Sequence, residues 1–503
     1  MPNDVEEEAP ENTIEIEEIP LVTNDALRVV DNGDPSTQND EVETEDVTVS
    51  LRTLYLAQLL STWGDQCSIY TTALAFTYIF SETWLPGVLF TLMGQLTNFL
   101  LGSTVGSWVD RSPRLSGPHK SSPITTISPT LVIRASLIGQ NSAVVAVSIF
   151  QYLLFQYRDT FPPWHEWHFS LTYVGLLIAG CTSALFSMSR DIAVSRDWLV
   201  VVAQDRNTLT SANAVMKRIN LVSKVAAPVG ISVLLEYVGA SQTVLILAAW
   251  NAISVIPEYL LLSIVYDREP KLAERQVDEK KKRQNPIVSL YQGWKTYSKQ
   301  LVLGSSISYI LLFMNGATPG SLTNSYLRFR GVDVLAIGIF QGIGAVVGLG
   351  ATFATPSSIR RFGLAKTALA GIWLQHLLVL IAILSFWAQS LCREGQSVCL
   401  DATIYSFQLF IVLSRLGLWS FDICHVQIMQ EGVDKENIGV VSGVEYSLTN
   451  LAFTVILAAG TVFNEPSTYI YVLGISYAAI LTAGIVHTLW FYHKSKEALT
   501  ERC

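Results

Sequence analysis

Apolar segments of about 20 residues recur along almost the whole chain after residue 50, and we count about twelve of them. A segment of this length can cross the hydrocarbon core of a bilayer as a helix. Only 15% of the residues are charged, whereas typical soluble domains contain about 25%. The sequence therefore predicts an all-α polytopic membrane protein. The candidate spans are 53–80, 84–108, 129–155, 169–190, 209–237, 240–266, 300–326, 333–355, 364–389, 402–429, 438–462 and 468–492.

One long polar break, Asp267 to Gln300, separates six candidate spans from the six that follow. Its last part, VSLYQGWKTYSKQ, is amphipathic and is expected to form a helix at the membrane surface. Two six-helix halves joined by such a loop describe the major facilitator architecture. The predicted division is an acidic tail (1–50), an N-terminal half (51–266), a linker with an amphipathic helix (267–299), a C-terminal half (300–493) and a short tail (494–503).

The two ends of the chain are expected to lie on the cytoplasmic side. Glutamates accumulate in residues 1–50 among Asn, Asp, Pro and Thr, which predicts a disordered tail and fits neither a signal peptide nor a transit peptide. Lys and Arg gather in the loops that an even number of spans with internal termini would place inside. We expect a multi-pass protein of the plasma membrane, with a vacuolar or other internal membrane as the alternative.

The first span contains a carboxylate, Asp65, in the stretch LLSTWGDQCSIY. A charged side chain at the bilayer centre costs about 2.5–3.5 kcal/mol, so Asp65 should face the bundle interior or a wet cavity. This position makes Asp65 the first functional candidate. The alternative is that Asp65 pairs with a Lys or Arg of a neighbouring helix and only holds the bundle together.

Three more polar residues lie within the apolar spans of the first half. Asn251 and Glu258 are seven residues apart and share one face of the sixth span, and Gln140 lies in the third span. With Asp65 they offer carboxylate and amide oxygens, which suit a hard or borderline divalent cation. Ordinary hydrogen bonding between helices is the alternative role for a single amide. Pro257 could also free backbone carbonyls as ligands.

The loop after the second span reads GSWVDRSPRL, with Asp110 and Arg114. These residues could pair with charges on neighbouring helix ends in one state and release them in another, which is the bistable contact that alternating access requires.

From residue 51 onward, several stretches in both halves resemble ferroportin, the family of solute carrier 40 iron exporters. The stretches are LSTWGDQ (60–66), GSWVDRSPRL (106–115), SLIGQN (136–141), RDWLVVVA (196–203), SANAVMKRIN (211–220), WNAISVIPEY (250–259) and RLGLWSFD (415–422). The resemblance implies export of Fe²⁺ by alternating access, coupled to counter-movement of protons. It also implies some tolerance for Mn²⁺, Co²⁺ or Zn²⁺, and no permanently bound cofactor.

The resemblance assigns roles to individual residues. Asp65 matches the family's metal ligand on the first helix, and the family's Ca²⁺ site corresponds to Asp65, Gln140, Asn251 and Glu258. The residues that match the cytoplasmic gate are Asp110, Arg114, Asp197, Asn213, Lys217 and Arg218. The family's partner for this gate is an arginine just before the glycine of the eleventh helix. Here Ile438 precedes Gly439, and Lys435 is a possible substitute.

The chain departs from the family at the other metal ligands. Ile69 replaces a histidine on the first helix, and Pro319 and Ile456 stand where a cysteine and a histidine form a second site. That cysteine is also the recognition point of the hormone hepcidin, so regulation by hepcidin is not expected. The stretch NGATPGS (315–321) still predicts a broken seventh helix.

Substitute ligands could come from the tenth span or the first. Asp422 and His425 are three residues apart and can share a helix face. Cys424 and Cys67 are further thiol candidates, since thiolate and imidazole suit iron, cobalt or zinc. Against this site, Cys424 points away from the Asp422 face, and a buried histidine bonded to a carbonyl is the commoner outcome.

Two other functions remain open at this stage. One is a transporter of another divalent metal or a small solute, with a Ca²⁺ site in the N-terminal half. The other is a receptor or scaffold that no longer transports. No enzyme motif is present, and the short basic clusters at the membrane face predict contact with lipid and not with nucleic acid. We expect a monomer, and a disulfide between Cys392 and Cys399 if their loop faces an oxidising side.

Overall fold

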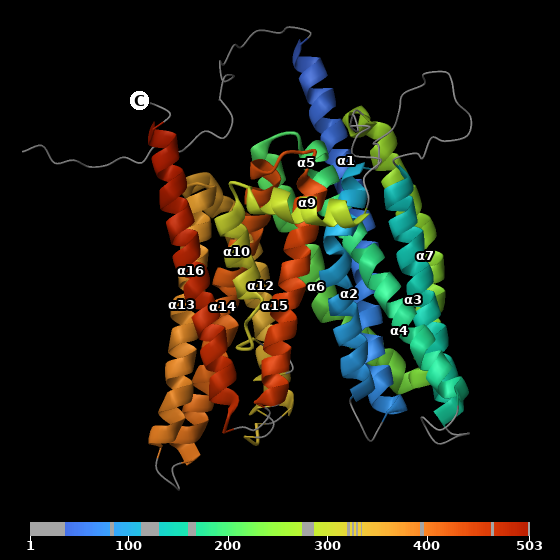
Figure 1. The fold of residues 1–503 in the computed structure, drawn as a ribbon, viewed down its shortest axis with the longest axis vertical. Coiled ribbons are helices and arrows are strands. Elements are labelled where there is room, and N and C mark those ends of the chain that lie inside the picture. The colour runs from blue at the N-terminus through green and yellow to red at the C-terminus, as the bar shows by residue number, and fades with distance from the viewer. Residues whose placement is uncertain are drawn as a thin grey trace, which may run out of the picture.

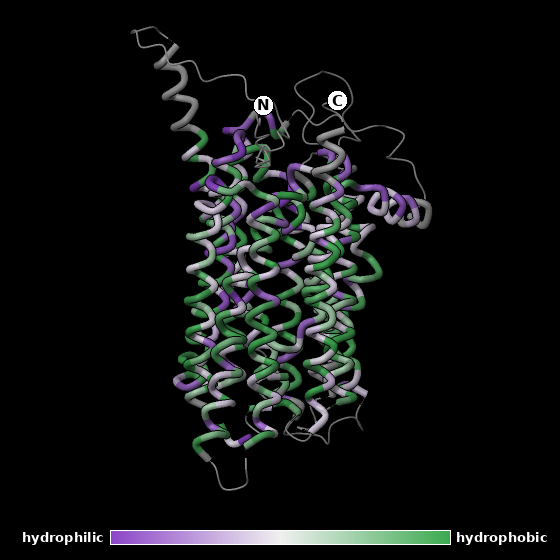
Figure 2. The backbone as a smooth tube through the Cα atoms, turned by 90° about the vertical axis from the view of Figure 1, so that its left-hand side faces the viewer, coloured by the Kyte–Doolittle hydropathy of each residue, from purple (hydrophilic) through white to green (hydrophobic). Residues whose placement is uncertain are grey.

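The computed structural model shows a bundle of long, roughly parallel helices (Figure 1). It describes residues 36–80, 85–111, 130–158, 167–273, 286–318, 322–323, 326–327, 330–332, 334–392, 397–463 and 467–500. The residues along the middle of the bundle are mostly hydrophobic, and those at the end where α1 begins and α16 ends are more hydrophilic (Figure 2). We call this end the terminal side.

The N-terminal half forms one side of the bundle and the C-terminal half the other (Figure 1). The elements of the first half are α1 (Ser36–Ile79), α2 (Leu85–Arg111), α3 (Thr130–Arg158), α4 (Trp167–Asp191), η1 (Ile192–Trp198), α5 (Leu199–Ala203), α6 (Arg206–Val238), α7 (Ala240–Arg268) and η2 (Pro270–Ala273). The elements of the second half are α9 (Pro286–Ser298), α10 (Leu303–Leu312), α12 (Val334–Phe362), α13 (Leu364–Ala388), η3 (Gln389–Leu391), α14 (Ser397–Gly432), α15 (Ile438–Val462) and α16 (Tyr469–Thr500).

Among the described residues, 9 helices are long and apolar enough to cross a membrane. The long helices α1 and α2 run beside them in the first half, and the short apolar helix α10 begins the seventh predicted span. The part of the chain that is described contains no β-strand. The prediction of an all-helical, multi-pass membrane protein is therefore confirmed. Helix α9 crosses the terminal side, where the amphipathic surface helix was expected (Figure 1).

Helix α1 begins at Ser36, well before the predicted boundary at residue 51. The stretch 36–50 is acidic but contains neither Gly nor Pro, and its glutamates are good helix formers, so the first span extends as a helix beyond the membrane. The expected disorder therefore does not hold for residues 36–50, and residues 1–35 lie outside the described part.

The predicted break in the seventh span is present. Helix α10 ends at Leu312, and residues 313–318 are not helical. The freed backbone groups find side-chain partners: the Gly316 amide donates to Ser476 Oγ at 2.8 Å, and the Thr323 hydroxyl donates to the Gly316 carbonyl at 3.0 Å. Such partners make non-helical backbone tolerable at membrane depth. Pro319 lies outside the described residues, and Ile456 is buried against the break, beside Gly316.

The disulfide between Cys392 and Cys399 is present and joins the residue after η3 to the first turn of α14. These ends of α13 and α14 lie at the end of the bundle opposite the terminal side (Figure 1).

The two halves approach most closely where α2 crosses α15. A Cβ atom added to Gly106 would overlap the carbonyl oxygen of Gly439, and one added to Gly443 would overlap the carbonyl oxygen of Gly102. Small residues four apart on both helices allow such backbone contact in membranes. The terminal side of the bundle is therefore closed by direct contact between the halves.

We predict that Gly106→Ala weakens this closure, because the added methyl group forces α2 and α15 apart at a cost of about 1–3 kcal/mol. Gly94→Ala on the same helix is the control, since a Cβ there meets nothing within 4 Å. The measurement is the electron–electron distance between spin labels at Lys271 and Arg361, in a background without free cysteines. A wider distance distribution is expected for Gly106→Ala alone, and an unchanged one would contradict this account of the packing.

Candidate functional site

Asp65 lies at the meeting point of three helices of the first half. Its carboxylate accepts a hydrogen bond from Gln140 Nε2 of α3 and forms an ion pair with Arg190 of α4, with Arg190 Nη2 2.7 Å from Asp65 Oδ2. Arg190 is only 5% exposed. The structure thus places Gln140 beside Asp65 as the shared-site prediction requires, and it also contains the helix-to-helix ion pair that was considered as the alternative.

The role of Arg190 was not predicted from the sequence. Arg190 is the last residue of the predicted span 169–190. A lone arginine at the end of an apolar run is a common topological signal, so the sequence alone did not show that it turns inward to a carboxylate.

Glu258 and Asn251 of α7 face the same part of α1. Ser61 Oγ donates to Glu258 Oε2 at 2.7 Å, and Glu258 is 2% exposed. The Asn251 amide nitrogen donates to the Leu247 carbonyl at 2.9 Å, which leaves its side-chain oxygen beside Gly64. Because Gly64 has no side chain, α7 can approach α1 next to Asp65. All four predicted ligands therefore lie around residues 61–65 of α1.

We call Asp65, Gln140, Asn251 and Glu258, together with Arg190, the N-half site. Its charged groups are two carboxylates and one guanidinium. Arg190 interacts electrostatically with both Asp65 and Glu258. Its Nε and Nη1 atoms, and the side-chain oxygen of Gln140, have no hydrogen-bond partner among the described residues. No group of three or more His, Cys, Asp or Glu side chains that could hold a metal ion occurs in the described part of the chain. A metal here would therefore need amide oxygens as well as Asp65 and Glu258.

The residues of the possible second site do not share one centre. Cys67 packs in an apolar cluster of the first half with Ala227, Ile231 and Leu247. Asp422 forms an ion pair with Lys217 and accepts a hydrogen bond from Tyr309. His425 contacts Ser305 at 3.0 Å and Glu445 at 3.0 Å, while the Cys424 thiol lies in the core of the second half. Each polar member of the set already has other partners.

Most of the predicted gate residues join the two halves on the terminal side. Lys217 of α6 lies 2.6 Å from Asp422 of α14, and its ammonium also lies over the Trp419 ring. Asn213 and Gln430 exchange two hydrogen bonds between the same helices. Arg218 donates to Thr352 of α12 and stacks on Phe353. Arg114 lies outside the described residues.

A further buried pair between the halves was not predicted. Arg196 of η1 lies 3.3 Å from Glu445 of α15, and both side chains are almost fully buried. Glu445 also accepts from Ser306, whose hydroxyl contacts the Tyr297 hydroxyl of α9 at 2.8 Å. Burial raises the pKa of Tyr297, so this hydroxyl stays protonated and available for the contact. These bonds connect the surface helix α9 to the gate.

Asp110 binds the backbone of the opposite half. Its carboxylate accepts from the backbone amides of Gly439 at 2.8 Å and Val440 at 2.6 Å, at the N-terminus of α15. A carboxylate at this position satisfies free amides and complements the helix dipole. Since Ile438 stands where the family has an arginine, the backbone supplies the contact. Asp197 and Lys435 line a neighbouring pocket of about 230 Å³ between the halves.

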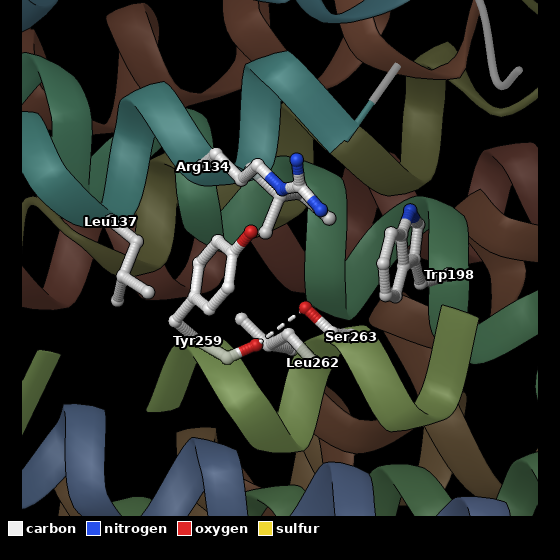
Figure 3. A pocket seen from close by; sticks show the side chains of 7 residues that line it. Arg134, Leu137, Trp198, Tyr259, Leu262 and Ser263 are labelled. Atoms are coloured by element: carbon white, nitrogen blue, oxygen red, sulfur yellow. Dashed lines mark hydrogen bonds between the residues drawn. The ribbon is translucent and has the colours of Figure 1, made fainter. Parts of the chain in front are cut away.

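Another pocket, of about 250 Å³, lies within the first half (Figure 3). Its polar side chains include Arg134, whose guanidinium lies 4.9 Å from the centre of the Tyr259 ring. The residues that line it are Ile133, Arg134, Leu137, Trp198, Tyr259, Leu262 and Ser263. None of the predicted metal ligands is among them.

Comparison with known sequences gives one consistent result. The family described as Ferroportin1 (FPN1) matches residues 48–480. Solute carrier family 40 member 1 from Oryza sativa subsp. japonica is 26% identical over 465 residues, which cover 89% of this chain and 92% of that protein.

Comparison with solved structures agrees. A bacterial homologue of the iron transporter ferroportin in its outward-facing state is 25% identical, with a TM-score of 0.75, and the match covers 88% of this chain and 99% of the homologue. An inward-facing structure of a bacterial homologue is 24% identical over 88% and 98% of the two chains, with a TM-score of 0.59. XylE, a proton:xylose symporter of the major facilitator superfamily, shares the fold at 11% identity, with a TM-score of 0.60 over 88% and 95% of the chains. The predicted major facilitator fold is confirmed.

We predict that Lys217→Met opens the terminal side, because it leaves the Asp422 carboxylate, 8% exposed, without its cation. Removing one partner of such a pair costs about 2 kcal/mol or more. Arg206→Met is the matched control, since that arginine pairs with Glu431 but is 46% exposed, and such pairs contribute about 0–1 kcal/mol. The measurement is disulfide crosslinking of Asn213→Cys with Gln430→Cys. Crosslinking that is as efficient with Lys217→Met as without it would count against this role.

Proposed function

This chain belongs to the ferroportin family, and from that premise we propose that it exports divalent iron from the cytoplasm by alternating access, in exchange for protons. Its family and its structural neighbours make it a metal transporter and not an enzyme. The observation that carries the finer proposal is the gathering of Asp65, Gln140, Asn251 and Glu258 around one short stretch of α1.

The chemistry of this N-half site supports a divalent cargo. Two carboxylates can neutralise an M²⁺ ion, and the Gln140 and Asn251 oxygens can complete a shell of oxygen ligands. The Gln140 oxygen has no hydrogen-bond partner among the described residues, so it is available as a ligand. Fe²⁺ is the proposed cargo, and Mn²⁺, Co²⁺ and Zn²⁺ are the related ions that the same oxygens would accept.

The closed terminal side supports a place for this structure in the transport cycle. Contacts between the halves at Gly106, Asp110, Lys217 and Arg196 seal that side. We assign the terminal side to the cytoplasm, because Arg206 at the start of α6, Arg360 and Arg361 at the end of α12, and Lys366 at the start of α13 lie there. The conformation is then outward-facing, in keeping with the outward-facing homologue that it resembles. A plasma-membrane location and a monomeric state complete the proposal.

A second candidate is transport of another divalent metal or a small solute, with Asp65 and Glu258 serving a Ca²⁺ site. The favouring observation is that isoleucines stand at two positions where the family has soft ligands: Ile69 is exposed, and Ile456 packs against the broken helix. An all-oxygen site does not select strongly for iron over harder ions.

We predict that Asp65→Asn abolishes metal transport, since it removes one of the two charges that would neutralise the ion. Purified protein in liposomes that contain a metal-sensitive dye would be tested for uptake of Fe²⁺, Mn²⁺, Co²⁺, Zn²⁺ and Ca²⁺. Asp267→Asn, which changes an exposed acid at the end of α7, should transport like the wild type.

Uptake of transition metals by the wild type that falls to background in Asp65→Asn is the expected result. Uptake of Ca²⁺ alone would favour the second candidate. If the folded wild type moves none of these ions, the export proposal is wrong, and the solute, receptor or scaffold functions take its place.

A further inference from the structure

We infer that Arg190 is an internal counter-ion of the N-half site, which occupies the cation position at Asp65 when no metal is bound and must be displaced by the metal. The inference rests on the proposed function. It starts from the ion pair of 2.7 Å between Arg190 Nη2 and Asp65 Oδ2, which is directed at the carboxylate that would be the first metal ligand.

The bonding of Arg190 is that of a group that can leave. A structural arginine in a bundle interior is expected to use most of its five donors, because unpaired buried donors are costly. Arg190 is 5% exposed, yet its Nε and Nη1 atoms have no partner among the described residues. Its hydrogen bond within the described part of the chain goes to Asp65, and the Gln140 oxygen beside that carboxylate has no partner there either. The site is therefore incompletely satisfied with the guanidinium in place.

The charges favour exchange with a divalent ion over a monovalent one. Asp65 and Glu258 carry two negative charges, and Arg190 neutralises one of them. A monovalent cation that displaced Arg190 would leave the net charge beside the two carboxylates unchanged, so the exchange would gain little free energy. A divalent ion can neutralise both carboxylates, and Asp191 remains nearby to interact with the displaced guanidinium. Arg190 thus acts as a selectivity element that requires a charge of two.

The position of Arg190 also links the site to the gate. Arg190 lies at the end of α4, directly before η1 (Ile192–Trp198), a π-helical segment of the kind that often occurs at functional sites. Arg196 in that segment forms the buried pair with Glu445 of the opposite half. Displacement of Arg190 would therefore move the segment that holds the two halves together.

The test is the dissociation constant of Co²⁺ and of Mn²⁺, measured by calorimetry on purified full-length protein. If Arg190 is paired with Asp65 in most molecules, the apparent dissociation constant of the metal equals the intrinsic constant divided by the fraction of molecules in which Asp65 is unpaired. Arg190→Gln should therefore bind the metal about tenfold more tightly or better. Arg134→Gln is the matched control: it removes the same charge from the first half but contacts Tyr259 and not Asp65, so its constant should equal that of the wild type.

Transport gives a second readout that a purely structural role would not produce. In liposomes, Arg190→Gln should lower the half-saturating metal concentration and also lower the maximal rate, because the metal is held more tightly and the link to η1 is lost. A fall in rate without a fall in half-saturating concentration would overturn the inference.

The outcomes separate this inference from the proposed function. If Asp65→Asn loses metal binding but Arg190→Gln binds no better than the wild type, Arg190 is only a structural partner, and the export proposal stands. If Asp65→Asn binds as the wild type does, both proposals fail. If Arg190→Gln does not fold, Arg190→Lys replaces the guanidinium with a single ammonium that leaves the carboxylate more readily. That variant should also bind more tightly, and an unchanged constant would refute the inference.

Discussion

A charge inside a membrane bundle has to be paired, and the architecture of this protein follows from where its pairs lie. Arg190 and Asp65 pair within the first half, whereas Arg196 with Glu445 and Lys217 with Asp422 pair across the two halves. The pairs across the halves exist only while the terminal side is closed. The pair within the first half occupies the position at which a transported cation would be bound. Site and gate are thus built from the same kind of interaction, and the short segment η1, which contains Arg196, connects them.

The contact between α2 and α15 shows how backbone amides can supply a gate contact at a position where the sequence has no arginine. Ile438 cannot pair with Asp110, but the amides at the start of α15 can, and the glycines of both helices bring the backbones close enough for this bond. The carboxylate keeps its role and changes its partner. Because the bond depends on close backbone packing, the gate is sensitive to the size of residues that carry no charge.

Much of this organisation could be predicted from the sequence, because it depends on local properties. Apolar length indicated the spans, NGATPGS indicated the break after α10, and the spacing of Asn251 and Glu258 placed both on one face of α7, which meets α1 in the structure. Arg190 and Glu445 were missed because their roles depend on which helices are neighbours. The possible site at Asp422 and His425 had the same weakness: a shared helix face does not show that Lys217 and Glu445 already occupy these side chains. The composition of the acidic tail predicts disorder, whereas residues 36–50 form the start of α1 because they combine good helix formers with no Gly or Pro.

The central claim is that the cargo and Arg190 compete for one carboxylate. The most direct measurement is anomalous diffraction from crystals of the full-length protein soaked with Mn²⁺ or Co²⁺. The account predicts an anomalous peak within bonding distance of Asp65, with the Arg190 guanidinium moved away from that carboxylate. A peak elsewhere in the bundle, or a peak beside Asp65 with the Arg190 ion pair still intact, would contradict it.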